Sequence, residues 1–320
     1  MFLLPRRLAA GALLLAALVL SSCAAPRATA PQRVEAFRPL PPVDDTARVS
    51  PAAHAAPVSP QLPGDPQPGA AASAHPHVTP ERLHEGYTIV VVGVNGDNIL
   101  SAGLAPGLID GGYPGAVEVV DWTTGYWPLF VYHLRAEQRH ATYARLIADK
   151  ILEYQAHYPG RPVNLVGYSA GAVVAVEAIE ALPAGATIDR AVLVAGAISP
   201  LYDLRTALLR TRDGIASYYQ TQDVVALWAG TLLAGTADGT HLPSAGAVGF
   251  WLPPGSSDDD RQLYRDKLVE VSYKPQMVLS GNLGGHFHCV GRSFVAQWIS
   301  PMLAGHPGHD LAMNESRALR

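Results

Sequence analysis

Apolar runs separated by short polar turns organise the chain from about residue 84 onward. Continuous runs of mostly β-branched residues are typical of strands buried on both faces. They predict strands at 88–92, 117–122, 163–166, 191–195 and 215–222, and a last strand within 269–279. Apolar positions at helical spacing predict helices at 129–157, 170–182, 203–212 and 294–303. This alternation implies an α/β fold, with a mostly parallel central sheet and helices on both faces.

The first 22 residues have the pattern of an export signal. Two arginines precede an apolar run at 8–20, which is too short to span a bilayer comfortably. The run ends in Leu20-Ser21-Ser22-Cys23, which resembles the lipobox of bacterial lipoproteins. That resemblance implies that Cys23 is acylated, becomes the mature N-terminus and anchors the exported protein to membrane lipid of the cell envelope. The alternative is an ordinary cleaved signal with an incidental cysteine.

The segment after the signal differs in composition from the rest. Residues 24–83 hold 13 of the 27 prolines, with many alanines and no apolar periodicity. Proline removes an amide donor and disfavours helix in the residue before it, so we expect an extended or disordered tether. The sequence therefore divides into a signal peptide at 1–22, a Pro/Ala-rich tether at 23–83, a folded domain at 84–304 and a polar tail at 305–320.

The net charge and the number of cysteines argue against a nucleic-acid partner and against stabilisation by a disulfide. The net charge of −4 provides no basic field for nucleic acid, so no nucleic-acid partner is expected. The chain has two cysteines, Cys23 and Cys289. Acylation of Cys23 leaves Cys289 without a disulfide partner, so the hydrophobic core must hold the domain together.

A serine lies between two glycines at the end of the third predicted strand. The stretch reads Gly167-Tyr168-Ser169-Ala170-Gly171, and a helix is predicted to follow it. A sharp strand-to-helix turn strains its central residue, and side chains two positions either side would collide with the neighbouring strand and helix. Such a turn exposes the hydroxyl beside a helix N-terminus, whose free amides favour a developing anion. The pattern favours Ser169 as a nucleophile over a spectator serine in a tight turn.

From about residue 84 to residue 304, the chain resembles the α/β-hydrolases. The likeness rests on the stretch 167–171, on the strand and glycine turn at 92–94, and on an acid and then a histidine downstream of the serine. The resemblance implies an α/β-hydrolase fold. It also implies that a serine attacks an acyl carbonyl, a histidine relays the proton and a carboxylate orients the histidine.

The resemblance places the histidine in the loop after the last strand, where His286 and His288 both lie. His286 is favoured because glycines before it permit a free loop geometry and Phe287 is available to pack its ring. His288 is the alternative. The acid is expected at Asp223, directly after the fifth predicted strand, with Asp203 as the alternative.

The reaction also needs two donors for the oxyanion. One is expected to be the amide of Ala170, the residue after the nucleophile. The other is expected in the turn after the first strand, at Val94, with Asn95 as the alternative. Many family members carry a histidine before the glycine of this turn, whereas this chain carries Val92. That departure costs little, because the donor is a backbone amide.

Other polar clusters are weaker candidates. His286, His288 and Cys289 suggest a metal site, but the chain has no HExxH or CxxC motif, so no metal or cofactor is expected. The acidic run 258–260 is expected to be a solvated charge cluster in a loop. Two interpretations of 224–267 stay open: an acyl pocket or cap, or a helix and loop packed over the core.

The sequence thus predicts a lipid-anchored serine hydrolase that cleaves carboxylic esters, with lipid esters as one option, through an acyl-enzyme. The loop 122–127, which carries tryptophan and tyrosine, is expected to border the site. An acyltransferase or a peptidase of the same fold is the first alternative, because one fold hosts many reactions. A non-catalytic envelope binding protein is the second.

Overall fold

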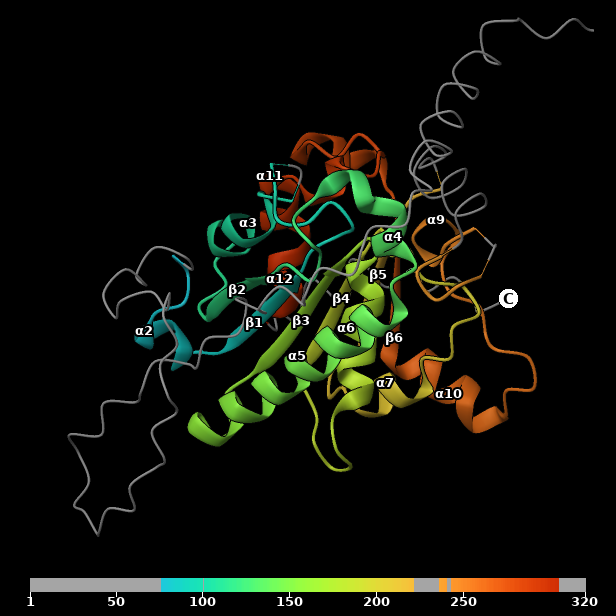
Figure 1. Ribbon diagram of the computed structural model, residues 1–320, viewed down its shortest axis with the longest axis horizontal. Helices are drawn as coiled ribbons and strands as arrows, with labels where there is room; N and C mark the ends of the chain where they lie inside the picture. Colours follow the sequence, from blue (N-terminus) through green and yellow to red (C-terminus); the bar gives the residue numbers. More distant parts are fainter. Residues whose placement is uncertain (1–75, 100, 222–235, 241–242, 305–320) are drawn as a thin grey trace, which may run out of the picture. The chain divides into compact units, whose positions relative to one another are not determined.

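A computed structural model describes residues 76–99, 101–221, 236–240 and 243–304. Its centre is one sheet of six parallel strands in the spatial order β2-β1-β3-β4-β5-β6 (Figure 1). The strands are β1 Tyr87–Val91, β2 Ala116–Val120, β3 Val163–Tyr168, β4 Arg190–Val194, β5 Ile215–Tyr219 and β6 Leu268–Ser272. Strands β1 to β5 are almost entirely buried, as continuous apolar runs predict for strands covered on both faces.

Helices cover both faces of the sheet (Figure 1). One face carries α5 Glu137–His157, α6 Gly171–Ala181, α7 Arg205–Leu209 and α10 Asp258–Lys267, and α5 packs along α6. The other carries α3 Leu104–Asp110, α11 Arg292–Phe294, the π-helical η6 Val295–Ile299 and α12 Ser300–Leu303. Shorter elements are α2 Pro80–Leu83, η2 Trp127–Leu129, α4 Phe130–Leu134, α9 Ala245–Val248, η4 Pro275–Ser280 and η5 His288–Val290. The predicted α/β-hydrolase fold, with its parallel sheet between two helical layers, is confirmed.

The direction in which the sheet is built reverses between β1 and β3. From β1 the chain moves to the edge strand β2, returns to β3 on the other side of β1, and continues outward through β4, β5 and β6. In open parallel sheets, ligands bind outside the carboxyl ends of the strands at such a switch point. The loops that follow β1 and β3 carry Val94 and Ser169, so both residues lie at this place.

The helix predicted at 129–157 is interrupted. Helix α4 ends at Leu134 and α5 begins at Glu137, and between them Ala136 leaves the helical region with φ −84° and ψ 59°. Near this break the ring of His140 donates from Nε2 to the carbonyl oxygen of His133 at 2.8 Å. Apolar spacing carries no information about such a side-chain contact, so the pattern alone predicted one continuous helix.

Local chemistry decides two further elements. The last strand, predicted within 269–279, is β6, and it ends at Ser272 because η4 begins at Pro275, which lacks the amide that a sheet ladder needs. The acidic run 258–260 forms the first turn of α10 instead of a loop. Ser257 Oγ accepts from the Asp260 amide, and the Asp260 carboxylate accepts from the Ser257 amide, which is a capping box. Carboxylates in a first turn also favour the helix dipole.

Several predicted features lie outside the described residues. They are the signal peptide, Cys23, the tether up to residue 75, Asp223 and the tail from residue 305. Helix α2 falls within the range predicted as tether, and its Leu83 is fully buried. Among the helices of the described ranges, none has both the length and the apolar character needed to cross a bilayer.

Candidate active site

Ser169 occupies a strained turn between β3 and α6. Its φ is 54°, one of two positive values among the described residues other than glycine. A residue in this region costs roughly 1–3 kcal/mol and persists only where its surroundings enforce the conformation. Here the end of β4 does so: the Ser169 amide donates to Val194 O at 3.0 Å, and Ser169 O accepts from the Ala197 amide at 3.0 Å.

The glycines two positions either side of this serine are required by close packing. A Cβ at Gly167 would lie 2.7 Å from the Ala172 Cα, in the helix that follows. A Cβ at Gly171 would collide with two carbonyl oxygens at the end of β1. These are the two collisions expected from the sequence, one with the helix and one with the neighbouring strand.

His286 lies within hydrogen-bond distance of Ser169. The distance between His286 Nε2 and Ser169 Oγ is 3.1 Å, although the two residues are 117 positions apart in the chain. When Nε2 carries no hydrogen, the serine hydroxyl donates to it, which is the arrangement that a general base needs. Ser169 is only 6% exposed, so the turn leaves its hydroxyl less accessible than the sequence predicted. A strained serine and an imidazole at this distance can together form an oxygen nucleophile.

The backbone and ring of His286 are held by three neighbours. Its carbonyl oxygen accepts from Tyr168 Oη at 3.1 Å and from Cys289 Sγ at 3.0 Å. The ring centroid lies 5.2 Å from that of Tyr168 and 5.4 Å from that of Phe287, which is edge-on at 79°. Sequence analysis missed Tyr168. The available signal was that a buried tyrosine needs a partner for its hydroxyl, but the sequence does not say which loop provides it.

His288, the alternative base, is exposed and lies in η5. Its amide donates to Gly285 O at 3.0 Å, and a Cβ at Gly285 would lie 2.9 Å from its Nδ1. The ring of His288 therefore lies over a glycine of its own loop. Of the two histidines, the structure brings His286 to Ser169.

These histidines and the neighbouring cysteine do not converge on a common point. His286 faces Ser169, His288 lies against Gly285, and the buried Cys289 thiol donates to the His286 carbonyl. Across the described residues, no three side chains of His, Cys, Asp or Glu are grouped so as to hold a metal ion.

The predicted acid cannot be placed, because Asp223 lies two positions beyond Thr221, where the described chain after β5 stops. Its role remains a prediction. The alternative, Asp203, has a different partner: its two carboxylate oxygens accept from the Arg205 guanidinium at 2.5 to 3.0 Å. Those hydrogen bonds from Arg205 lower the pKa of Asp203. Asp203 thus forms an ion pair at the start of α7.

The turn after β1 presents backbone amides beside the serine. The Gly96 amide donates to Gly93 O at 3.0 Å, which makes Val94 and Asn95 the central residues of a β-turn. A Cβ at Gly93 would lie 3.1 Å from Ser169 Cβ, so the turn passes directly against the nucleophile. Among the described backbone hydrogen bonds outside helices and strands, the Val94 and Asn95 amides donate to no carbonyl.

The other predicted oxyanion donor, Ala170, is the N-cap residue of α6 and is fully buried. Amides at the start of a helix have no intrahelical acceptor, because no turn precedes them. Its N–H is also absent from the described backbone hydrogen bonds outside helices and strands. Both predicted donors therefore lie next to the serine: Ala170 follows Ser169 in the chain, and Val94 follows Gly93, which packs against Ser169.

The aromatic loop expected to border the site has two different parts. Trp122 is fully buried, and its Nε1 donates to Val92 O at 2.6 Å, so it supports the end of β1 from below the surface. Tyr126, four residues later, is 62% exposed. Tyr126 is therefore accessible to a substrate at the surface, whereas Trp122 is not.

The described part of 224–267 packs against the sheet. The Ala245 amide donates to Ile198 O at 2.7 Å, and the Gly246 amide donates to Gly196 O at 2.9 Å, which joins α9 to the loop after β4. For this part, the interpretation as helix and loop over the core is the one observed. Residues 224–235 and 241–242 lie outside the described residues, and they include two of the three apolar stretches considered for an acyl pocket. In the third, 249–252, Phe250 is buried and Trp251 is 38% exposed.

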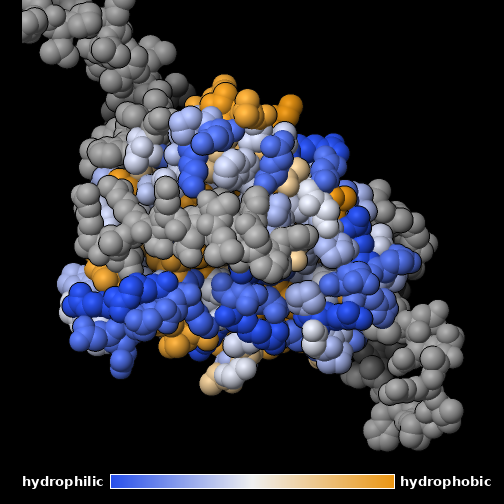
Figure 2. Space-filling model, turned by 180° about the vertical axis from the view of Figure 1, so that it is seen from behind, coloured by the Kyte–Doolittle hydropathy of each residue, from blue (hydrophilic) through white to orange (hydrophobic). Residues whose placement is uncertain are grey.

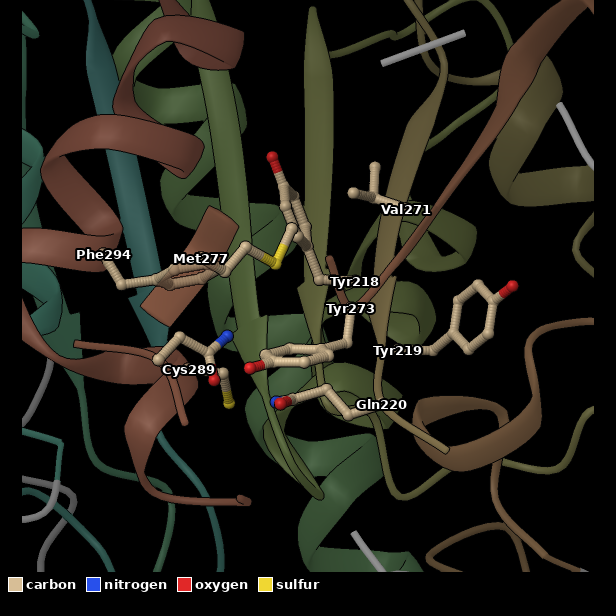
Figure 3. Close-up of a pocket in the computed structure, with 9 residues that line it drawn as sticks. Tyr218, Tyr219, Gln220, Val271, Tyr273, Met277, Cys289 and Phe294 are labelled. Atoms are coloured by element: carbon tan, nitrogen blue, oxygen red, sulfur yellow. The ribbon is translucent and has the colours of Figure 1, made fainter. Parts of the chain in front are cut away.

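A small pocket adjoins the histidine loop. Figure 3 shows that the side chains of Gln220 and Tyr273 point toward Cys289. The remaining lining residues are Tyr218, Tyr219, Val271, Met277, Asn282 and Phe294. Neither Ser169 nor His286 lines it, so this pocket lies beside the Ser–His pair and borders the base of the loop that carries His286.

Comparisons with known proteins find similarity only to solved structures, and the two described below have low sequence identity and low TM-scores. No protein-family model matches the chain, and no curated protein matches it. Among solved structures, RedJ with a PEG molecule bound in its active site is similar, at 14% identity and a TM-score of 0.30, covering 69% of this chain and 84% of RedJ. The NocB thioesterase domain, in covalent complex with a fluorophosphonate nocardicin G analogue, is similar at 17% identity and a TM-score of 0.32. That match covers 67% of this chain and 94% of the NocB domain.

Proposed function

We propose that the protein is a serine hydrolase that cleaves carboxylic esters through an acyl-enzyme. The observation that carries this proposal is the 3.1 Å contact between Ser169 Oγ, in a turn with φ 54°, and His286 Nε2. Strain at a single residue is maintained only when the surroundings enforce it, and here it directs a hydroxyl toward a base. The amides of Ala170 and Val94 provide the second requirement, a site for negative charge.

In the acylation step, Ser169 Oγ bonds to the ester carbonyl carbon while His286 Nε2 takes the hydroxyl proton. The carbonyl π electrons move onto oxygen, and the Ala170 and Val94 amides donate to this oxyanion. When the oxyanion collapses, the bond to the leaving alkoxide breaks. His286 then gives its proton to that oxygen, and an alcohol is released.

In the deacylation step, His286 removes a proton from water as the water oxygen bonds to the acyl carbon. Collapse of the second oxyanion breaks the bond to Ser169 Oγ, which recovers the proton from His286, and a carboxylic acid leaves. We assign to Asp223 the role of accepting from the Nδ1 hydrogen of His286 and stabilising the imidazolium. Protons and electrons balance with these residues and water alone.

Exposed apolar side chains around the site favour a substrate with an apolar acyl group. Ile99 follows β1, Phe130 follows β2, and Leu279, Leu283 and Phe287 follow β6, and each is at least 40% exposed. The carboxyl ends of parallel strands meet at one edge, so these side chains share the edge that carries Ser169. Figure 2 shows apolar residues gathered at the upper end of the molecule, toward which β6 runs in Figure 1. An apolar rim of this kind favours binding of hydrocarbon.

The test uses a fluorophosphonate probe, which labels activated serines, with Ser169→Ala as the matched control. We expect labelling of the wild type and none of the variant. A series of p-nitrophenyl esters of increasing chain length, offered beside thioesters and amides, then defines the acyl group and the scissile bond. A folded wild type that neither reacts with the probe nor hydrolyses any of these compounds refutes the proposal and favours a binding protein. Preference for amides favours a peptidase, and preference for an added alcohol over water favours an acyltransferase.

We also propose that the protein is exported and anchored to the bacterial cell envelope through an acylated Cys23, with a Pro/Ala-rich tether between the lipid and the domain. Replacement of Cys23 by serine removes the thiol that receives the lipid, so Cys23→Ser is expected to move the protein from the membrane fraction to the soluble fraction. Continued membrane association of this variant contradicts lipidation at Cys23.

A further inference from the structure

A fully buried histidine outside the Ser–His pair contacts the turn that carries the proposed oxyanion donor. His133, in α4, has no exposed surface. Its Nδ1 lies 2.9 Å from the carbonyl oxygen of Val94. Its Nε2 lies 3.2 Å from the amide nitrogen of Thr124 and 2.9 Å from the Thr124 hydroxyl. One ring therefore bridges the loops that follow β1 and β2.

These partners determine the tautomer of His133. The Thr124 amide can only donate, so Nε2 must be the acceptor and carry no hydrogen. Nδ1 then carries the hydrogen and donates to the Val94 carbonyl, which can only accept. Burial lowers the pKa of His133, which favours this neutral form. The ring thus has a defined donor side and a defined acceptor side.

The contact with Val94 O controls the orientation of peptide planes beside Ser169. In a trans peptide, the N–H points opposite to the C=O of the same plane. Gly93 O is held by the Gly96 amide, which directs the Val94 N–H, and Val94 O is held by His133, which directs the Asn95 N–H. Both central amides of the turn are therefore fixed through their neighbouring carbonyls, and His133 provides one of the two constraints.

The same turn is held at other positions from the side of β2. Trp122 Nε1 donates to Val92 O at 2.6 Å, and an Asp121 carboxylate oxygen accepts from the Asp97 amide at 3.0 Å. The carbonyl of His133 itself accepts from the ring of His140, which fixes the position of α4. Within the turn, Asn98 and Ser101 of the same loop donate to the carbonyls of Asn95 and Gly96. His133 holds the turn from another element, α4, through Val94 O.

We propose that His133 is a positioning residue, whose Nδ1–H donates to the Val94 carbonyl. This bond fixes the peptide plane between Val94 and Asn95, and so sets the direction of the Asn95 amide, the alternative second donor, and the position of Val94 beside the oxyanion formed on Ser169. This inference rests on the proposed serine hydrolase function. It assigns no contact with substrate to His133: the residue acts through the backbone of Val94. A loss of aim weakens charge stabilisation in the transition state more than it weakens binding of the ester, so it changes kcat before KM.

Two substitutions at this position separate its two hydrogen bonds. The amide nitrogen of asparagine overlays Nδ1, so His133→Asn keeps a donor for Val94 O and loses the acceptor for Thr124. The amide end of glutamine overlays Nε2, so His133→Gln keeps an acceptor for Thr124 and loses the donor to Val94. Both variants bury a neutral polar side chain, so each is the matched control for the other.

The measurement is kcat and KM on p-nitrophenyl butyrate, with the thermal midpoint of each variant. Loss of one oxyanion donor costs about 10²–10³ in kcat, and a misaimed donor costs less. We expect His133→Gln to lower kcat about 10- to 100-fold with KM within about twofold, and His133→Asn to stay within about fivefold of wild type. Equal losses in the two variants, or an unchanged kcat in folded His133→Gln, overturn the inference and leave the hydrolase function intact. A folded wild type that neither reacts with the fluorophosphonate probe nor hydrolyses any compound of the ester, thioester and amide series overturns both.

A measurement on the wild type does not depend on the folding of either variant. Neutron diffraction from deuterated crystals locates the hydrogen on the ring of His133. A hydrogen on Nδ1, directed at Val94 O, is the expected result. A hydrogen on Nε2 removes the donor to Val94 and overturns the inference, whatever the kinetics of the variants.

Discussion

The carboxyl end and the amino end of the sheet differ in backbone strain and in the pairing of their polar groups. At the carboxyl end, Ser169 and Ala195 have positive φ, and the amides of Val94 and Asn95 lie in a turn that leaves them without a backbone acceptor. Toward the amino end, the buried charged groups are paired. Glu118 accepts from both Lys150 and Tyr87, and the side chains of Glu118 and Lys150 are each only 3% exposed.

This contrast separates what the protein uses for stability from what it offers to a ligand. Buried charges are tolerated when they are paired and hydrogen-bonded, and such networks rigidify the core. Backbone strain and unpaired amides lower the stability of the fold. They are retained where they serve function, as when a ligand or a transition state accepts a hydrogen bond from such an amide. Substitutions at the carboxyl end should therefore change activity at constant stability, and substitutions at the amino end should change stability at constant activity.

The largest expected effect is on activity, at His286. Without a base, Ser169 is a weak nucleophile, so His286→Ala should lower kcat by roughly 10⁴-fold or more. The thermal midpoint should change little, because the His286 side chain is only partly buried. Steady-state hydrolysis of a p-nitrophenyl ester and a thermal melt check the two statements.

His288→Ala provides the matched control, two positions away in the same loop. Its ring is exposed and lies over Gly285, so its removal should change kcat by no more than a few fold. The opposite ranking, with the large loss in His288→Ala, would transfer the role of base to His288 and contradict the 3.1 Å contact as the catalytic one.

The second effect is on stability, at Lys150. Its Nζ lies 2.5 Å from a Glu118 carboxylate oxygen, and Lys150→Met leaves that carboxylate buried with only the Tyr87 hydroxyl. Removal of one partner of a buried ion pair costs roughly 3–5 kcal/mol. Urea denaturation should show this loss, whereas kcat per folded molecule should match the wild type.

The double variant Glu118→Leu, Lys150→Met tests whether the unpaired charge is the cause. It removes both charges, so it should be more stable than Lys150→Met alone, although Tyr87 loses its acceptor. A double variant as unstable as the single one would mean that packing of the lysine stem, and not the charge, carries the effect. A fall in kcat in either variant would weaken the contrast between the two ends.

Local pattern predicted the elements that depend on local chemistry. The apolar runs located all six strands within a few residues, because a strand buried on both faces must be apolar throughout. The glycines around Ser169 predicted the sharp turn from β3 to α6, because the collisions they avoid involve only the adjacent helix and strand. Both inferences use residues that lie close together along the chain or repeat at a fixed period.

Contacts between distant loops were beyond the reach of the pattern. The choice between His286 and His288 depends on how one loop crosses the end of β3, and the glycines before His286 favoured it without fixing that path. His133 was hidden inside a predicted helix, and its partners Val94 and Thr124 lie on two other loops. A polar residue at a buried position signals that a partner exists, but only the fold identifies the partner.

The smallest expected effect concerns a carboxylate that departs from the pairing seen toward the amino end. Glu177 lies in α6, and its Oε2 is buried with no hydrogen-bond partner among the described residues. Burial, and then the nearby Glu180, raise its pKa to about 7. The folded protein therefore holds a proton that the unfolded chain releases near pH 4.5, so Glu177 destabilises the fold increasingly as pH rises from about 4.5 through 7.

Glu177→Gln replaces this group with a neutral one of the same shape. The variant should match the wild type near pH 4, where Glu177 is mostly protonated in both the folded and the unfolded chain. It should be more stable at pH 8 by about 1 kcal/mol, a value reduced for the partial exposure of the side chain. Urea denaturation at the two pH values measures the difference, and buried histidines cancel because both proteins contain them. Glu180→Gln is the control, because Glu180 already accepts from the Tyr202 hydroxyl at 2.9 Å and should gain less. If Glu177→Gln is no more stable than the wild type at pH 8, the Glu177 carboxylate has a hydrogen-bond partner in solution. Its environment then resembles that of the paired Glu118, and the prediction is wrong.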